Sequence, residues 1–306
     1  MALTIAHDQL PLTDECRHYE VLGDVPWDIQ KYWHQRYSIF ESYDYDVRLT
    51  DEAWFGVTPE PVAKKIAEDL AAWSSSESKT KNHMTKKKKG TIIDMFGGAG
   101  GNVIAFALSE EWARVVAIEK DAATLACAQH NADVYGVREA ITFVLGDSLA
   151  FMARLRRCHK LPSVSKSSGQ QADDTEMEDG EQYDEDDEIE TLLRSIDPAG
   201  ATVFASPPWG GVSYAELEVF DLSRMEPYSL ADLHGACAPL EHTLFLPRSS
   251  DVRQVAGVLA PSLGNQGGGK LDVVQYCMNG ASKAMVVFVP ASESLLSSSA
   301  AAAAVK

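Results

Sequence analysis

The chain lacks the hydrophobic segments that mark membrane and secreted proteins. None of its 306 residues belongs to a run of about 18 consecutive apolar residues, so we expect no transmembrane helix. The N-terminus has no basic stretch followed by an apolar one, so we expect no secretory signal. Hydrophobic residues still make up 45% of the sequence, which is enough for a sizeable core. The composition predicts a soluble globular protein.

Cysteine is scarce, and its spacing matches no known site. There is no CxxC motif, and neither the histidines nor the five cysteines cluster as metal ligands do: Cys16, Cys127, Cys158, Cys237 and Cys277. We therefore expect a reduced, intracellular protein without a metal site.

Basic residues are outnumbered, 27 against 45 acidic ones, and the formal net charge is −18. Twelve of the carboxylates, and no base, lie within residues 173–190, so the rest of the chain has a net charge of −6. Such a segment cannot bury enough apolar surface to offset the entropy cost of ordering. We predict a disordered acidic insertion at about residues 160–196. It is either merely solvated or a tail that binds a protein partner or excludes RNA.

Two other stretches are of low complexity. Residues 74–89, with serines at 74–76 and lysines at 86–89, are predicted to be a polar linker. The lysines could equally be a nuclear localisation patch or contact RNA phosphates. Residues 291–306 are predicted to be a disordered tail.

A predicted strand at 91–94 leads into a glycine-rich turn. The turn is Gly97-Gly98-Ala99-Gly100-Gly101-Asn102, and the apolar helix 103–108 follows it. Glycine tolerates positive φ and lets a ligand approach the backbone closely. By itself the turn could hold a dinucleotide pyrophosphate or be only a tight connection.

Acidic residues at three strand ends indicate which cofactor the glycine-rich turn would bind. Asp94 ends the first strand, Glu119 follows the strand 114–118, and Asp147 follows the strand 141–145. A carboxylate at the second strand end typically accepts hydrogen bonds from ribose hydroxyls, and Asp147 could accept one from an adenine amino group. Three carboxylates suit a sulfonium cofactor that carries an ammonium group better than a pyrophosphate. This favours S-adenosylmethionine, with NAD and purely structural turns as the alternatives.

A rigid aromatic loop follows the apolar run 201–205. Its sequence is Ser206-Pro207-Pro208-Trp209. The prolines hold φ near about −65° and donate no backbone hydrogen bond, while Trp209 offers a flat π-face. The loop suits a planar base that carries an exocyclic amine.

The order of elements predicts the fold class. Strands and helices alternate between 91 and 259, which implies an α/β fold with a parallel sheet. Asn279-Gly280 joins the apolar runs 271–278 and 284–289 as a hairpin. A terminal antiparallel hairpin on a Rossmann-like sheet is typical of class I methyltransferases rather than of dehydrogenases. We place this methyltransferase domain at residues 90–290.

A small helical lobe is predicted ahead of it, at residues 19–73. Ile29, Trp33, Tyr37 and Phe40 recur at helical spacing. Thr58 is predicted to cap a helix that has Pro59 at its first position. We expect the lobe to cover the mouth of the cofactor site.

These motifs resemble one family. The proline-proline-aromatic loop looks like that of class I aminomethyltransferases. The longer strings are more specific and resemble the RNA cap guanosine-N2 methyltransferases, the trimethylguanosine synthase family: Ser206-Pro207-Pro208-Trp209-Gly210-Gly211, Asp94-Met95-Phe96-Gly97-Gly98-Ala99-Gly100-Gly101-Asn102 and Lys31-Tyr32-Trp33-His34-Gln35-Arg36-Tyr37. That family converts a 7-methylguanosine RNA cap to its 2,2,7-trimethyl form. Glu119 stands where the family more usually has aspartate, but it keeps the acceptor.

The resemblance implies roles for individual residues. The catalytic loop would be Ser206, Pro207 and Trp209, with Trp209 also stacking on the cap, and Lys31 and Arg248 would contact the cap triphosphate. The implied cofactor-binding residues are Asp94, Phe96, Gly97, Gly98, Gly100, Asn102, Glu119, Asp147, Phe40 and Thr58. The implied substrates are 7-methylguanosine-capped small nuclear and nucleolar RNAs, with S-adenosylhomocysteine as a product. We expect a monomer in the nucleus or nucleolus.

Two alternatives stay open from the sequence. A methyltransferase for an internal base of DNA or rRNA would need a broad basic surface, and the sequence has no basic cluster outside residues 86–89. A non-catalytic cap- or RNA-binding module would be expected to lose the glycine turn or the proline-proline-aromatic loop. Both are intact here.

Overall fold

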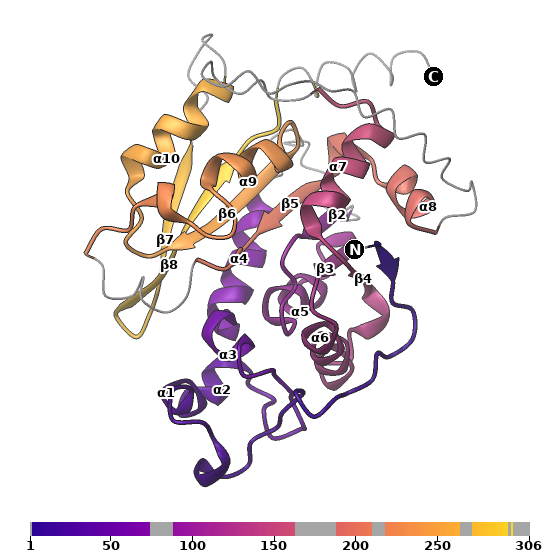
Figure 1. Cartoon of the computed structure of the whole chain (residues 1–306). Coiled ribbons are helices and arrows are strands. Elements are labelled where there is room, and N and C mark those ends of the chain that lie inside the picture. The colour runs from indigo at the N-terminus through magenta and orange to yellow at the C-terminus, as the bar shows by residue number, and fades with distance from the viewer. Residues whose placement is uncertain are drawn as a thin grey trace, which may run out of the picture.

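An eight-stranded sheet forms the centre of the molecule (Figure 1). The computed structural model describes residues 2–73, 88–162, 188–209, 218–263, 271–292 and 295. The strand order is β1-β4-β3-β2-β5-β6-β8-β7. Five neighbouring strands run parallel: β2 (Lys89–Asp94), β3 (Trp112–Glu119), β4 (Ile141–Leu145), β5 (Thr202–Ala205) and β6 (Glu241–Pro247). The chain order reverses between β2 and β5, which is where doubly wound sheets bind ligands.

An antiparallel hairpin completes one edge of the sheet. β7 (Asp272–Met278) and β8 (Ala281–Val289) pair with each other, and β8 pairs with β6. Asn279 and Gly280, between them, have φ angles of 52° and 76°. Positive φ at both central residues is what a type I′ hairpin turn requires. The predicted parallel sheet with a terminal hairpin is confirmed. At the other edge, β1 (Thr4–Ile5) pairs antiparallel with β4, which the sequence did not indicate.

Helices cover both faces of the sheet, and alternate strand residues point to each. Ile92 and Val115 pack into one core with residues of α4 (Glu60–Trp73), α5 (Gly101–Leu108) and α6 (Ala122–Val134). Ile93 and Val116 pack into the other with residues of α7 (Ser148–Cys158), α8 (Glu188–Ser195), α9 (Leu230–Cys237) and α10 (Val252–Leu259). This two-residue alternation is the pleat of a strand buried on both sides. No described helix is long and apolar enough to cross a membrane.

The N-terminal lobe is helical, but the spacing between Ile29 and Phe40 does not produce one continuous helix. Two single-turn helices occupy that segment, α1 (Gln30–Trp33) and α2 (Arg36–Ile39), and α3 (Ala53–Gly56) follows. Trp33 is buried, and its indole nitrogen donates to the Tyr19 carbonyl over 2.8 Å. Short 3₁₀ turns lie at Leu22–Asp24, Arg138–Ala140, Pro198–Gly200, Leu222–Arg224 and Ala260–Leu263.

The predicted disorder of residues 160–196 is wrong at its C-terminal end. Residues 188–195 form α8, where Ile189 and Leu193 are buried, and Ile196 after it is buried as well. Glu190 of α8 accepts a hydrogen bond from Arg154 over 3.0 Å. The prediction of disorder rested on the many carboxylates, and it overlooked apolar residues that recur at helical spacing. Residues 163–187, like most of the predicted linker and tail, lie outside the described residues.

The C-terminal end of the predicted linker also differs from expectation. Lys89 is the first residue of β2, and its ammonium group donates to the carbonyls of Leu70 and Ala71 near the end of α4. Cations stabilise the carbonyl end of a helix. Lys89 therefore has a structural role that the linker interpretation did not include.

Two variants should distinguish the contribution of α8 to stability from that of the acidic segment before it. Leu193→Ala is expected to lower the free energy of unfolding by about 2–5 kcal/mol, because it leaves a cavity under a fully buried side chain. Replacing residues 165–186 with a Gly/Ser linker of equal length should leave the unfolding free energy close to that of the parent. Urea denaturation measures both. A large loss in the linker variant would show that the acidic segment contributes to the folded core.

Two buried histidines lie between α9 and β6. The Nδ1 atom of His242 is 2.8 Å from the Leu240 carbonyl, so it must donate, and its Nε2 accepts from Nδ1 of His234 over 2.9 Å. This arrangement needs the His242 ring neutral, because a charged ring has no nitrogen that accepts. Burial lowers the pKa of His242 to about 3 and also lowers the pKa of His234.

Acid is therefore expected to destabilise the fold through His242. The pKa is depressed in the folded state, so the unfolded chain takes up the proton first, and stability falls as pH drops from about 6.5 toward 3. The loss from His242 should be about 2 kcal/mol at pH 5. Urea unfolding between pH 7.5 and 4.5 should show a shallower pH dependence for His242→Leu than for the parent. His34→Gln, at an exposed position, is the control and should follow the parent. Parallel profiles for His242→Leu and the parent would refute the assignment.

Candidate active site

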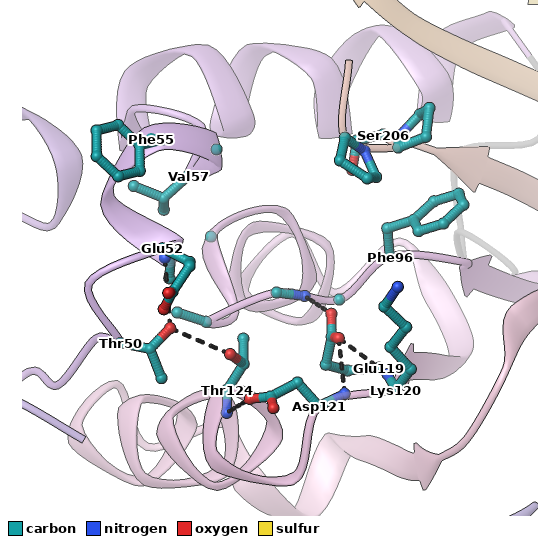
Figure 2. A pocket seen from close by; sticks show the side chains of 18 of the residues that line it. Thr50, Glu52, Phe55, Val57, Phe96, Glu119, Lys120, Asp121, Thr124 and Ser206 are labelled. Carbon is teal, nitrogen blue, oxygen red and sulfur yellow. Dashed lines mark hydrogen bonds between the residues drawn. The ribbon is translucent and has the colours of Figure 1, made fainter. Parts of the chain in front are cut away.

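A cavity of about 1000 Å³ lies at the carboxyl ends of the parallel strands. It adjoins β2 and β5, where the strand order reverses. Its volume is at the upper end of the range for small-molecule sites, so it has room for more than one ligand. In Figure 2, Phe55 and Val57 lie across the cavity from Phe96, and Glu119 lies between the two sides.

The glycine-rich turn forms one wall. Gly98 has a φ of +52° and Gly100, the N-cap residue of α5, a φ of +99°, both in the region that favours glycine. A Cβ at Gly101 would lie 3.1 Å from Val57 and 3.2 Å from the carbonyl oxygen of Thr58. The turn therefore brings the lobe against the sheet domain at this point.

Glu119 is held by backbone donors at the end of β3. Its Oε2 accepts from Gly98 N over 3.1 Å, and Oε1 accepts from the amides of Lys120 and Asp121 over 2.9 and 3.0 Å. Burial raises the pKa of this carboxyl above its usual value. Because Oε2 accepts only one of these hydrogen bonds, its second lone pair can still accept from a ligand hydroxyl.

Asp94, at the end of β2, is behind the cavity wall and does not line it. It is 1% exposed, and its Oδ1 accepts from the Phe96 amide over 3.1 Å. Its Oδ2 is buried with no partner among the described residues. Burial raises the pKa of Asp94 to about 7. Asp94 thus fixes the backbone that presents Phe96 and the glycine turn.

Asp147 and Tyr228 lie together on the cavity wall. Asp147 caps α7, with its Oδ1 accepting from Ala150 N over 2.8 Å. The Tyr228 hydroxyl is 3.4 Å from Oδ2 of Asp147. The Tyr228 ring is 5.7 Å from the Phe96 ring. The predicted adenine end of the site therefore has a carboxylate and two aromatic rings.

Thr58 and Asn102 connect the lobe to the glycine turn. The Asn102 Nδ2 donates to the Thr58 hydroxyl over 3.0 Å, and both residues line the cavity. The Asn102 side-chain oxygen is buried and has no partner in the part of the chain that the structure describes. A buried acceptor without a partner is costly, and a bound donor would satisfy it.

The proline-rich loop follows β5, which lies on the other side of β2 from β3 and β4. Ser206, Pro207, Pro208 and Trp209 all line the cavity. The Trp209 ring stacks on Phe245 of β6, with centroids 5.6 Å apart and planes inclined by 14°. Its indole nitrogen donates to the Phe245 carbonyl over 3.3 Å. The tryptophan is therefore held in one orientation before any ligand binds.

The structure brings together most of the predicted site residues, but not all. Those that line the cavity are Thr58, Phe96, Gly97, Gly98, Asn102, Glu119, Asp147, Ser206, Pro207 and Trp209. Asp94, Gly100, Phe40, Lys31 and Arg248 are not among its lining residues. Phe40 is buried beside Tyr135 with ring centroids 6.1 Å apart, while Lys31 and Arg248 are exposed. The roles of all these residues stay predictions.

Other lining residues were not picked out from the sequence: Phe55, Val57, Lys120, Tyr228 and Phe245. Phe245 lies in an apolar strand, and the sequence of that strand does not show which of its side chains face the site. Tyr228 stands alone in a polar stretch, and only the start of α9 brings it to the cavity. In the described part of the chain, no group of three His, Cys, Asp or Glu side chains could hold a metal ion.

The doubly wound sheet with its terminal hairpin, and a cavity with carboxylates at successive strand ends, define a class I methyltransferase. The family model described as RNA cap guanine-N2 methyltransferase matches residues 89–292. The chain belongs to this family, as the sequence motifs predicted.

The chain is similar to two named proteins of this family and to a solved methyltransferase domain. A trimethylguanosine synthase of Schizosaccharomyces pombe is 31% identical over 235 residues, which are 76% of this chain and 76% of the relative. A trimethylguanosine synthase of Saccharomyces cerevisiae is 28% identical over 238 residues, which are 76% of this chain and 59% of the relative. Among solved structures, the METTL16 methyltransferase domain is 12% identical with a TM-score of 0.46, over 92% of this chain and 86% of that one.

Proposed function

We propose that the protein transfers methyl groups from S-adenosylmethionine to the N2 amine of the 7-methylguanosine cap of RNA, forming the 2,2,7-trimethyl cap. The observation that carries this proposal is the composition of one cavity. Among its lining residues, Glu119 and Asp147 lie at the ends of β3 and β4, on one side of β2, and the Ser206–Trp209 loop follows β5, on the other side. The first set suits an adenosine and the second a planar base, so donor and acceptor would meet in one space.

The cavity residues fit the cofactor. Glu119 is fixed by three backbone amides and keeps one lone pair, on Oε2, for a ribose hydroxyl. Asp147 lines the cavity, and its Oδ2, which does not cap α7, can accept from an adenine amine. The unpartnered oxygen of Asn102 suits the ammonium group of the methionine part. Bound here, S-adenosylmethionine would supply an activated methyl group on its sulfonium.

The loop would bind and orient the guanine. The Ser206 hydroxyl and the Pro207 carbonyl can accept hydrogen bonds from the N2 amine, which localises its lone pair and aims it at the methyl carbon. Its proton becomes acidic only as the methyl group is transferred, so no separate general base is needed. Trp209 would stack on the positively charged 7-methylguanine, with a cation–π contribution of about 0.5–2 kcal/mol.

Cations outside the cavity would bind the rest of the cap. Lys31 is next to Tyr32, whose ring packs edge-on against Phe55 of the cavity wall with centroids 5.5 Å apart. Arg248 is three residues beyond Phe245, just after β6. Both positions are compatible with a triphosphate that leaves the cavity. We also propose that the protein is a nuclear monomer and that it acts on small nuclear and nucleolar RNAs.

Product analysis tests the reaction. The protein is incubated with S-adenosylmethionine and a 7-methylguanosine cap dinucleotide, and the products are digested to nucleosides and identified by mass spectrometry. We expect one and then two methyl groups on N2. Methyl groups on any other atom, or none, would contradict the proposal.

A further inference from the structure

Tyr228 is held rigidly at the cavity by the start of α9. It immediately precedes Ser229, whose side chain caps the helix in a reciprocal capping box with Asp232. Leu230 and Leu233 of that helix are buried in the core. A capped and buried helix start fixes the backbone direction of the residue before it. The Tyr228 side chain is therefore presented to the cavity by a rigid element.

The contacts of Tyr228 point to the adenine end of the site. Its ring is inclined by 45° to the Phe96 ring, and the centroids are 5.7 Å apart. Its hydroxyl is 3.4 Å from Oδ2 of Asp147, the carboxylate oxygen that does not cap α7. Burial raises the pKa of Tyr228, and the nearby Asp147 adds to the effect. The phenol thus stays protonated at neutral pH and donates to the carboxylate.

We infer that Tyr228 is a positioning residue for the cofactor adenine. Its hydroxyl orients Asp147 Oδ2 toward the 6-amino group, and its ring, with that of Phe96, provides aromatic surface at this end. The inference rests on the proposed S-adenosylmethionine function. It adds a residue that acts through Asp147 and takes no part in the methyl transfer itself.

Calorimetric titration with two ligands tests the inference. One ligand is S-adenosylhomocysteine, and the other is its analogue whose adenine lacks the 6-amino group. Tyr228→Phe removes only the hydroxyl and should weaken S-adenosylhomocysteine binding by about 3- to 10-fold, since one hydrogen bond is lost. The analogue should bind Tyr228→Phe and the parent equally. Tyr228→Ala should weaken the binding of both ligands further. The control is Tyr45→Ala, at a position that is 76% exposed and outside the cavity, and it should bind both ligands as the parent does.

The outcomes separate this inference from the proposed function. A parent protein that binds no S-adenosylhomocysteine would overturn the proposed cofactor, and the inference with it. A parent that binds it, with Tyr228→Phe unchanged, would overturn the inference alone. An equal loss of affinity for both ligands in Tyr228→Phe would also overturn it, because a merely structural role would affect the ligands with and without the 6-amino group alike. Melting temperatures confirm that the variants are folded.

Discussion

Replacing Trp209 with alanine is expected to lower kcat/KM for the 7-methylguanosine cap by about 5- to 150-fold. Stacking of a base on an aromatic side chain contributes roughly 1–3 kcal/mol. The alanine removes both this surface and the cation–π attraction for the methylated ring. It also removes the stacking of Trp209 on Phe245, whose ring centroids are 5.6 Å apart. Trp209→Phe should retain part of the activity. Steady-state kinetics with a cap dinucleotide measure the effect.

The matched control is Trp27→Ala. Trp27 is 86% exposed and does not line the cavity, so this variant should keep the activity of the parent. Binding of S-adenosylhomocysteine should stay within a few-fold of the parent in Trp209→Ala, because the indole is at the substrate end. Full activity of Trp209→Ala on the cap would show that the base stacks elsewhere.

Asp94→Ala should weaken S-adenosylhomocysteine binding by about 100-fold or more. The carboxylate fixes the Phe96 amide over 3.1 Å and supports the start of the glycine turn from inside the core. Loss of a buried hydrogen-bonding group costs about 1–3 kcal/mol, and here the displaced backbone would also misplace Phe96 and Gly98. Calorimetry measures the affinity. Asp24→Ala, at an exposed position, is the control, and unchanged affinity in Asp94→Ala would refute this role.

The pKa of Asp94 adds a pH dependence. Burial raises it to about 7, so the carboxyl gains a proton as pH falls through 7. A ligand that carries an ammonium group favours the ionised form, so the affinity should decrease below about pH 7 in the parent. Asp94→Asn cannot titrate and should lose this dependence. Calorimetry at pH 6 and pH 8 compares the two proteins.

Much of the sheet could be predicted because its signals are local. Asp94, Glu119 and Asp147 follow apolar runs, and parallel strands bring their carboxyl ends to one edge. Asn279-Gly280 specifies a hairpin from its own backbone preferences. The strand edge alone did not show that Asp94 points into the core while Glu119 lines the cavity. The two side chains take the same face of the sheet, because Asp94 pairs with Ala117 and Glu119 lies two residues farther along β3. The difference depends on how far each strand extends toward the cavity, which the sequence of one strand does not show.

Other features depend on contacts between distant parts of the chain. β1 has two residues, too few for any periodicity, and exists because it pairs with β4. The apolar stripe of α8 was hidden by the acidic residues around it. Tyr228 reaches the cavity only because α9 begins beside it. In each case the local sequence is ambiguous and tertiary packing decides the structure.

The most direct test of the cap-methyltransferase account is a comparison of three substrates. Methyl transfer from labelled S-adenosylmethionine is measured with a 7-methylguanosine cap dinucleotide, the same dinucleotide without the 7-methyl group, and an uncapped RNA. We predict that kcat/KM for the methylated cap exceeds that for the unmethylated cap by about tenfold or more, since 1.4 kcal/mol of additional stacking gives that ratio. Uncapped RNA should accept no label. Equal turnover of the two caps, or efficient methylation of uncapped RNA, would contradict the account.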